Sequence, residues 1–253
     1  MIVSVHSYRG GTGKSNLTAN LASCVVQQGK RAAVVDTDIQ SPGLHVHFGM
    51  DGQTTGLTLN DYLYGRCRIE QAAHDVTATL GPAAAKGDAL YLIPSSIKAG
   101  EITRVLRDGY EVSLLTDGFR ALIKTFQLDY LFIDSHPGLN EETLLSLILS
   151  DILVLILRPD QQDFQGTAVT VEVARKLKVK RLLLVVNNVL PKLDQASLRQ
   201  QVQTVYEAPV AGILPVSEEM IALGSAGIFS LAHPDHPYSQ GVREIAAQVL
   251  SAA

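Results

Sequence analysis

The residues that decide the fold stand at the start of the chain and read Ile2-Val3-Ser4-Val5-His6-Ser7-Tyr8-Arg9-Gly10-Gly11-Thr12-Gly13-Lys14-Ser15. A short apolar run with the residues of a strand leads into a glycine-rich turn, and a segment with helical periodicity follows it. Glycines let the backbone turn tightly with its N–H groups pointing inward, and the N-terminus of a helix adds partial positive charge. The order of strand, glycine turn and helix therefore predicts a P-loop that binds phosphate groups.

Within this loop, the side chains at its end carry the chemistry. The ammonium of Lys14 would neutralise the β and γ phosphates, and the hydroxyl of Ser15 would coordinate Mg²⁺. The alternative is a glycine-rich turn with a chance lysine, but the strand before it and the apolar helix face after it disfavour that interpretation. The residues predicted to bind the nucleotide are Gly10, Gly11, Thr12, Gly13, Lys14, Ser15 and Asn16.

The same alternation of strands and helices continues to the end of the chain. Strands are predicted at Ile2–His6, Ala32–Asp36, Ala89–Pro94, Tyr130–Asp134, Asp151–Leu157, Arg181–Val186 and Val210–Leu214. Helices are predicted at Lys14–Gln28, Ser113–Phe126, Glu141–Leu149, Gln165–Lys176, Gln195–Tyr206 and Ser239–Ala252. This pattern predicts an α/β fold, a doubly wound and mainly parallel sheet flanked by helices, as in P-loop NTPases. We expect one domain over residues 1–253, with a lid or insertion at about 50–87.

The composition favours a cytoplasmic globular protein. Of the 253 residues, 46% are hydrophobic and 18% are charged, which excludes a disordered chain. The net charge of −4 gives no overall sign of a protein that coats nucleic acid, and DNA binding stays open. The two cysteines lie in no CxxC pair, as expected of reduced thiols in the cytoplasm. No signal peptide or membrane-spanning segment is evident.

Carboxylates follow two of the predicted strands. Asp36 and Asp38 come at the end of one strand, and Asp134 ends another in the pattern Asp-x-x-x-Gly that closes at Gly138. Parallel sheets hold their ligands at the carboxyl ends of the strands, where these acids would meet the P-loop. Each aspartate could instead be a strand-end cap. His136, within the same turn, is either a hydrogen-bonded structural residue or a proton carrier.

The loop resembles the deviant Walker A motif of the MinD/ParA family of dimerising ATPases. The family pattern is Lys-Gly-Gly-x-Gly-Lys-Ser/Thr, and this chain has Arg9 in place of the first lysine. The resemblance implies ATP and Mg²⁺ as ligands and an ATP-dependent homodimer, in which the first basic residue of each subunit reaches the phosphates of the other. Arginine keeps the charge, but its planar head is not equivalent to an ammonium at a phosphate site.

The resemblance also implies roles for the acidic residues. Asp38 would orient the attacking water, so that the catalytic set is Lys14, Asp38 and Arg9. Asp36 would support Mg²⁺ through a bound water, and Asp134 would hold Mg²⁺ or its water, which makes Ser15, Asp36 and Asp134 the metal set. The N–H group of Gly138 would sense the γ-phosphate.

An asparagine after a late strand would contact the adenine, again by resemblance. The strand at 182–186 leads into Asn187 and Asn188, either of which fits, although an asparagine that stabilises a turn is the alternative. Pro159, in the turn Arg158-Pro159-Asp160, is predicted to line the same pocket. Adenine in preference to guanine rests on the resemblance, since no Asn-Lys-x-Asp signature is present.

The function predicted from these features is a slow MgATP hydrolase that acts as a dimerisation switch in positioning or partitioning cellular cargo. An unidentified activating or cargo protein is the expected partner. The alternatives are a nucleotide-dependent regulatory binding module with negligible turnover and a P-loop small-molecule kinase. The last predicted helix has an apolar stripe typical of core packing, and no basic amphipathic tail follows it, so no direct membrane anchor is expected.

Overall fold

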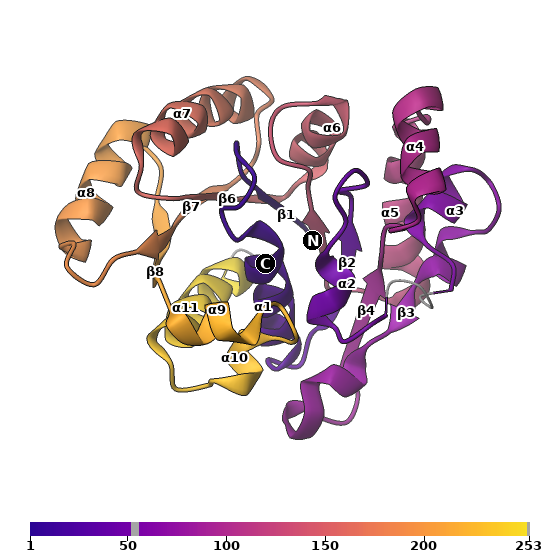
Figure 1. Ribbon diagram of the computed structural model, residues 1–253, viewed down its shortest axis with the longest axis horizontal. Helices are drawn as coiled ribbons and strands as arrows, with labels where there is room; N and C mark the ends of the chain where they lie inside the picture. The colour runs from indigo at the N-terminus through magenta and orange to yellow at the C-terminus, as the bar shows by residue number, and fades with distance from the viewer. Residues whose placement is uncertain (52–55, 252–253) are drawn as a thin grey trace.

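An eight-stranded sheet lies between two layers of helices in the computed structural model, which describes residues 1–51 and 56–251 (Figure 1). The order of the strands across the sheet is β3-β4-β2-β5-β1-β6-β7-β8. Only the pairing of β3 with β4 is antiparallel among the described strands. The strands are β1 (Ile2–His6), β2 (Arg31–Asp36), β3 (His74–Asp75), β4 (Ala89–Ile93), β5 (Tyr130–Asp134), β6 (Ile152–Leu157), β7 (Leu182–Val189) and β8 (Val210–Pro215). The predicted fold class is confirmed.

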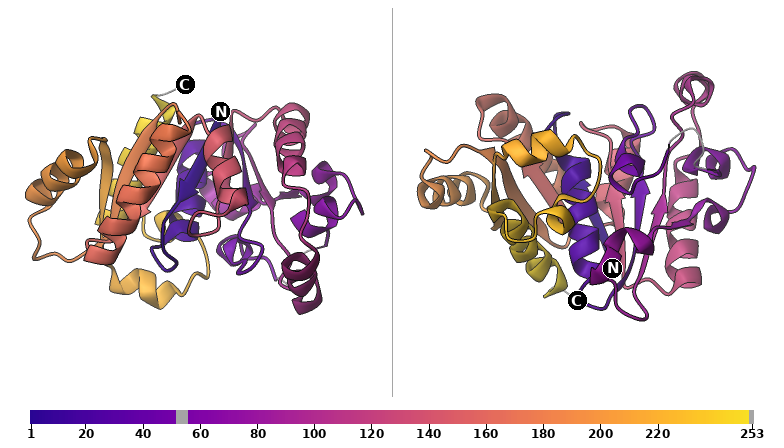
Figure 2. Two further views of the ribbon diagram at one scale, coloured as in Figure 1. Left: turned by 90° about the horizontal axis from the view of Figure 1, so that it is seen from above. Right: turned by 60° about the horizontal axis from the view of Figure 1, so that its bottom comes forward.

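The helices cover both faces of this sheet (Figures 1 and 2). The α-helices are α1 (Lys14–Val26), α2 (Leu44–His47), α3 (Leu59–Leu63), α4 (Ala99–Asp108), α5 (Ser113–Phe126), α6 (Glu141–Leu149), α7 (Gln161–Lys176), α8 (Gln195–Tyr206), α9 (Glu218–Leu223), α10 (Phe229–Ala232) and α11 (Pro237–Leu250). Two 3₁₀ segments, η1 (Ile69–Ala72) and η2 (Thr77–Ala83), belong to the region before β4. One apolar core joins α1 and α11 to the sheet, while α5 to α8 pack on the opposite face.

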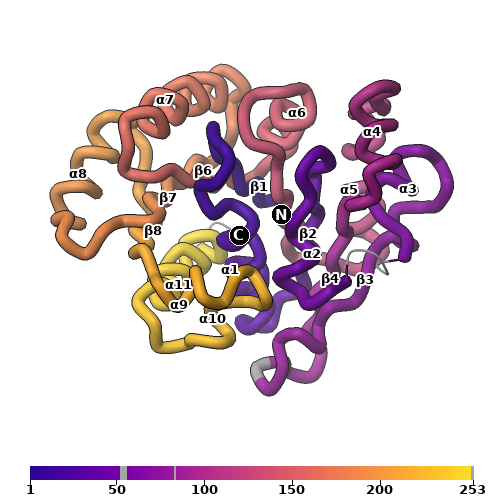
Figure 3. Tube along the Cα trace, in the orientation of Figure 1, coloured from indigo at the N-terminus to yellow at the C-terminus, as the bar shows by residue number. Residues whose placement is uncertain are grey.

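The topology brings the functional loops to one edge of the sheet. Because the strands from β4 to β8 are parallel, their carboxyl ends lie together, and β1 is central, between β5 and β6. Asp134 at the end of β5 is in register with both Val5 of β1 and Asp36 of β2. The chain leaves β1 at this edge, forms the glycine loop and enters α1 directly, as the trace in Figure 3 shows.

Helix α1 is a rigid support for that loop. All but Ser15 and Asn16 of its residues are buried, which is the pattern of a helix enclosed on every side. Leu17 and Leu21 are completely inaccessible to solvent, and α1 packs on β2, β5 and α11. The first turn of α1 therefore holds Lys14 and Ser15 in a fixed position at the sheet edge.

The seven predicted strands are all present, with small shifts at their ends, but several short elements were not predicted. The edge strand β3 has only two residues, too few for a periodic signal. Helix α4 carries Ile102, Val105 and Leu106 at helical spacing, and this signal was missed. Helix α7 begins at Gln161, before the predicted Gln165, because the Asp160 side chain caps it by accepting a hydrogen bond from Asp163 N. The predicted end of the last helix, Ala252, lies outside the described residues.

The predicted lid at about 50–87 includes residues 52–55, which lie outside the described residues. Its described remainder comprises α3, η1, β3 and η2, with β3 pairing with β4 at the sheet edge. Both α3 and α5 contact η1. The function of this segment as a lid stays a prediction.

Across residues 1–51 and 56–251, none of the helices combines the length and the apolar character needed to cross a bilayer.

Candidate nucleotide site

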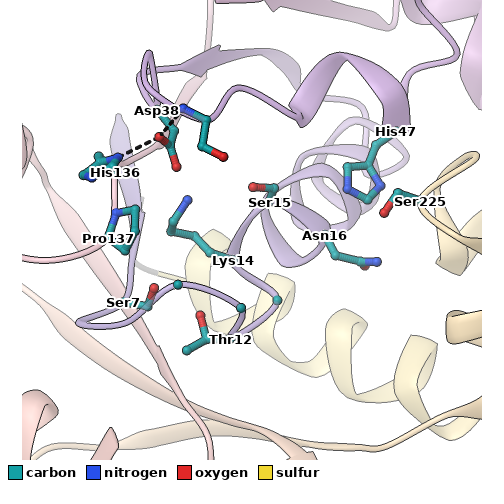
Figure 4. Close-up of a pocket in the computed structure, with 14 residues that line it drawn as sticks. Ser7, Thr12, Lys14, Ser15, Asn16, Asp38, His47, His136, Pro137 and Ser225 are labelled. Carbon is teal, nitrogen blue, oxygen red and sulfur yellow. Dashed lines mark hydrogen bonds and ion pairs between the residues drawn. The ribbon is translucent and has the colours of Figure 1, made fainter. Parts of the chain in front are cut away.

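The glycine loop forms the floor of a cavity of about 340 Å³ at the carboxyl edge of the sheet (Figure 4). Its other walls come from four segments: the turn after β2, helix α2, the turn after β5 and the loop after α9. The lining residues are Ser7, Gly10, Gly11, Thr12, Gly13, Lys14, Ser15, Asn16, Asp38, Ser41, His47, His136, Pro137 and Ser225. The seven residues predicted to bind nucleotide are thus brought together around one cavity.

The backbone of the loop requires glycine at Gly13. This residue has φ of 91°, in the left-handed region, and a Cβ there would lie 2.5 Å from Asn187 Nδ2. Asn187 lies this close to the loop because its Nδ2 donates a hydrogen bond of 2.8 Å to Thr12 O. Asn187 therefore braces the loop from β7.

Lys14 is paired with a carboxylate at the base of the cavity. Its Nζ lies 3.1 Å from Asp134 Oδ1, and only 7% of Lys14 is exposed. The other oxygen, Asp134 Oδ2, is buried and has no hydrogen-bond partner among the described residues. A buried acceptor of this kind is costly unless a ligand or water satisfies it.

Asp36, predicted to support the metal, is completely buried and serves the backbone of the turn that follows it. Its Oδ1 accepts from Asp38 N, and its Oδ2 accepts from the N–H groups of Gly43 and Leu44. Burial, together with the negative charge of the neighbouring Asp134, raises the pKa of Asp36 to about 8. These bonds occupy both carboxylate oxygens, so Asp36 fits the role of a loop organiser better than that of a metal ligand.

Asp38 lies in the cavity wall and faces the turn after β5. Its Oδ1 is 2.7 Å from His136 Nδ1 and accepts a second hydrogen bond from Ser41 N at 3.2 Å. Figure 4 shows Asp38 and His136 next to one another on one side of the cavity, joined by this hydrogen bond, with Lys14 below them. Asp38 thus lines the same cavity as the phosphate loop, and its role in orienting water stays a prediction.

The Gly138 amide, predicted to sense the γ-phosphate, has another partner in this structure. Gly138 N donates to Ser7 O at 3.2 Å, and Gly138 has φ of 87°. This bond ties the turn after β5 to the residue just after β1. Gly138 thus connects the two loops directly and does not present its N–H group to the cavity.

Arg9 points away from the cavity and joins a cluster of charges at the start of α7. Its Nη1 lies 3.3 Å from Asp163 Oδ1 and 3.5 Å from Asp160 Oδ1. Arg158 contacts the same two carboxylates, with Nε 3.2 Å from Asp163 Oδ2. In this structure Arg9 is therefore paired with local carboxylates and not with the phosphate site.

The two predicted base-pocket residues do not line this cavity. Pro159 lies in the turn between β6 and α7, flanked by the charged Arg158 and Asp160, so it borders the cluster around Arg9. Asn187 is buried beneath the loop, and its Oδ1 has no hydrogen-bond partner among the described residues. Asn188, the other candidate, is exposed and has φ of 57°, typical of a turn asparagine.

Five residues of the cavity wall were not predicted from the sequence: Ser7, Ser41, His47, Pro137 and Ser225. Ser225 comes from the loop after α9, and His47 from α2, where its Nδ1 lies 3.4 Å from Gly227 O. Burial lowers the pKa of His47. Ser7 and Ser41 adjoin the predicted motifs, but no motif marks the segment containing Ser225.

A glycine loop between β1 and α1, a buried lysine and a carboxylate at the end of a neighbouring strand define a P-loop nucleotide-binding protein. Comparison with known families agrees: the model of the ParA family, described as "NUBPL iron-transfer P-loop NTPase", matches residues 1–250. The chain belongs to the MinD/ParA family of P-loop NTPases.

Several relatives span most of the chain. A protein of Methanocaldococcus jannaschii described as an uncharacterized ATP-binding protein is 26% identical, with 99% of this chain and 88% of that protein covered. The septum site-determining protein MinD of Helicobacter pylori is 24% identical, with 90% of this chain and 82% of that protein covered. The flagellum site-determining protein YlxH of the same species is 26% identical, with coverages of 77% and 60%.

Solved structures share the fold. The cell division ATPase MinD of Pyrococcus furiosus superposes with a TM-score of 0.81 at 21% identity, covering 100% of this chain and 99% of that one. MinD of Pyrococcus horikoshii, solved with Mg-ADP, gives a TM-score of 0.79 at 20% identity, with coverages of 98% and 95%. The likeness shows that this chain shares the fold of these proteins.

Proposed function

We propose that this chain binds MgATP in the cavity above the glycine loop, hydrolyses it slowly and dimerises in the ATP-bound state. The observation that carries the proposal is the pairing of Lys14 with Asp134 at the base of a glycine-lined cavity. The magnesium ion, the attacking water and the base would bind around this pair. The first step is phosphate binding, in which the Lys14 ammonium exchanges part of its contact with Asp134 for phosphate oxygens.

The residues present fit a magnesium ion held together with the phosphates. The unpartnered Asp134 Oδ2 and the Ser15 hydroxyl are oxygen donors of the kind that Mg²⁺ prefers. Mg²⁺ would supply charge neutralisation between the β and γ phosphates. Asp36 would act on this site only indirectly, because its oxygens already hold the backbone of Asp38, Gly43 and Leu44.

For hydrolysis, Asp38 is the residue we assign to the attacking water. It is the only carboxylate among the residues that line the cavity in the described part of the chain. Its Oδ1 is occupied by His136 and Ser41, which leaves Oδ2 for a water molecule. A carboxylate so placed orients the nucleophile, and orientation is a large part of catalysis in phosphoryl transfer.

We assign adenine as the base, with Asn187 as the residue that would recognise it. Its buried Oδ1 is an acceptor without a partner in the described structure, and the exocyclic amino group of adenine is a donor. Guanine would present a carbonyl oxygen instead, leaving both acceptors unsatisfied.

Dimerisation is the part of the proposal that involves Arg9. Two ATP molecules brought face to face repel one another unless cations enter the interface, and Arg9 directly precedes the glycines. To reach a partner's phosphates, Arg9 would leave Asp160 and Asp163, while Arg158 remains to neutralise them. The names of the relatives, which refer to septum and flagellum site determination, support a role in positioning cargo.

The proposal is tested by measuring molar mass and phosphate release on the same samples. Light scattering with ADP, with ATP and with a slowly hydrolysed ATP analogue should give a dimer with the two triphosphates only. Arg9→Ala should stay monomeric, and Asp38→Ala should form the dimer without releasing phosphate. A chain that binds MgATP but stays monomeric would favour the regulatory module, and a dimer that persists in Arg9→Ala would assign the bridging charge elsewhere.

A further inference from the structure

The contact between His136 and Asp38 lies in the cavity but belongs to none of the motifs that bind phosphate. His136 Nδ1 is 2.7 Å from Asp38 Oδ1, the shortest of the hydrogen bonds to that carboxylate. The side chains are 23% and 12% exposed, so the contact lies at the cavity wall and not on the open surface. Figure 4 shows the imidazole above Pro137, facing the carboxylate.

The direction of this hydrogen bond follows from the chemistry of its partners. An aspartate carboxylate only accepts hydrogen bonds, so the hydrogen must be on His136 Nδ1. Asp38 Oδ1 thus receives two donors, His136 Nδ1 and Ser41 N. Among the described residues Asp38 Oδ2 receives none, and it is therefore the oxygen free to accept from a water molecule.

His136 is itself held in place from two sides. Its carbonyl oxygen accepts a hydrogen bond of 3.2 Å from Thr143 Oγ1 in the first turn of α6. The residue after it is Pro137, which restricts the backbone of His136 to extended conformations. These contacts fix the backbone of His136 next to the carboxylate. The terminal torsions of both side chains have broad energy minima, so the hydrogen bond between them sets their mutual orientation.

We propose that His136 is a positioning residue that fixes the carboxylate of Asp38 so that Oδ2 faces the attacking water. This inference rests on the proposed function, since it assumes that Asp38 orients that water. Without the Nδ1 donor the carboxylate would rotate about its terminal torsion, and fewer molecules would hold the reactive geometry. Binding of ATP depends on the glycine loop and Lys14, neither of which His136 contacts by a hydrogen bond.

The position of the donor on the ring allows a precise rescue. The amide nitrogen of asparagine occupies nearly the place of Nδ1, whereas that of glutamine reaches further, toward the place of Nε2. Since only Nδ1 contacts Asp38, His136→Asn should restore the hydrogen bond and His136→Gln should not. A histidine that merely filled space would show the opposite order, because glutamine is closer to it in volume.

The experiment measures kcat and KM for MgATP by phosphate release in the parent and in His136→Ala, His136→Asn, His136→Gln, Asp38→Ala and the double variant. We expect His136→Ala to lower kcat about 10- to 100-fold, the usual effect of removing a partner that orients a functional group. KM should stay within about twofold of the parent, since only a step after binding is affected. His136→Asn should regain most of the lost turnover. His74→Asn, at the remote edge strand β3, is the matched control.

The double variant tests whether His136 acts through Asp38. If His136 acts through Asp38, the double variant should be no slower than Asp38→Ala alone, because the effects are not additive. A parental or raised kcat in His136→Ala, or a further loss in the double variant, would overturn the inference while leaving the proposed function intact. A parent without phosphate release, or Asp38→Ala with parental turnover, would overturn both.

Discussion

The two ends of the glycine loop each carry a cation, and the two cations lie in different surroundings. Lys14, at the inner end, is 7% exposed and pairs with Asp134 within the nucleotide site. Arg9, at the outer end, has a side chain that is 37% exposed and pairs with Asp160 and Asp163 at the start of α7. Both are next to carboxylates, but of the two cations only Lys14 lines the cavity.

The two cations therefore differ in what contact with a phosphate requires: Lys14 can accept a phosphate where it stands, whereas Arg9 has to move. For Lys14, an incoming phosphate can share the site with Asp134, and the helix below need not move. For Arg9, contact with any phosphate requires departure from α7, whose first turn depends on the same two carboxylates. The inner cation is therefore suited to binding and the outer one to a conformational step.

The largest effect is expected at the inner end. Lys14→Ala should weaken MgATP binding at least about 100-fold, because losing one partner of a buried charge contact costs about 3 kcal/mol or more. Calorimetric titration with MgATP measures the loss. Lys14→Gln retains a donor for Asp134 and should keep the folded structure while losing the same affinity.

Lys176→Ala, a variant of an exposed lysine at the end of α7, is the control for this titration. Undiminished affinity in both Lys14 variants would refute the assignment of the phosphate loop. Loss of affinity in the control as well would point to a general effect of charge.

The outer end should show an asymmetry in stability. Asp163 is 2% exposed and accepts hydrogen bonds from Arg158 N and from both arginine side chains. Asp163→Ala should therefore lower the free energy of unfolding by about 2–4 kcal/mol, somewhat less than a fully enclosed pair because the arginines reach solvent. Arg9→Ala should lower it by only about 0–1 kcal/mol, as for surface ion pairs.

Urea unfolding of the two variants and the parent checks this asymmetry. A loss in Arg9→Ala as large as that in Asp163→Ala would make Arg9 a structural cation of α7. In that case Arg9 could not leave the cluster, and the bridging role in a dimer would have to pass to another residue.

The sequence predicted the inner end of the loop better than the outer end, for a physical reason. Lys14 and Asp134 sit in motifs whose strand and helix context is local, so their meeting follows from the order of the parallel strands. The partners of Arg9 depend on where α7 begins, and the predicted start at Gln165 came after Asp163. Boundaries of this kind are set by caps such as Asp160, which the periodicity of apolar residues does not reveal.

The cavity wall shows the same limit. Asp38 was predicted because a strand end places it at the sheet edge, but its contact with His136 depends on two turns meeting. Ser225 comes from a loop that no motif marks, and its place in the wall follows only from packing of the chain after β8. Packing also gives Asn187 a contact that the sequence did not predict, since its amide donates a hydrogen bond to Thr12 O.

The smallest effect concerns a third basic group, His6, which lies behind the loop and is completely buried. Its Nδ1 is 2.8 Å from Ser135 Oγ, which itself donates to Val5 O, so Nδ1 carries the hydrogen and His6 is the donor. Nε2 has no hydrogen-bond partner among the described residues. Burial, and secondly the charge of Lys14, lowers the pKa of His6 to about 3. At the inner end of the loop, burial and the charge of Lys14 thus keep His6 neutral.

The free energy of unfolding should therefore decrease as the pH falls through the range in which the unfolded chain protonates His6 and the folded chain does not. The unfolded pKa of 6.5 and the folded pKa of about 3 define the window. Neutral His6 makes its full contribution to the free energy of unfolding above pH 6.5. Below pH 6.5 this free energy should decrease by up to about 1.4 kcal/mol per pH unit. His6→Asn keeps a donor for Ser135 and removes the titrating ring, so urea unfolding from pH 7 to pH 5 should show a flatter slope than the parent. The cavity left by the smaller side chain lowers the whole curve without changing its slope, and equal slopes would show that another group takes up the proton.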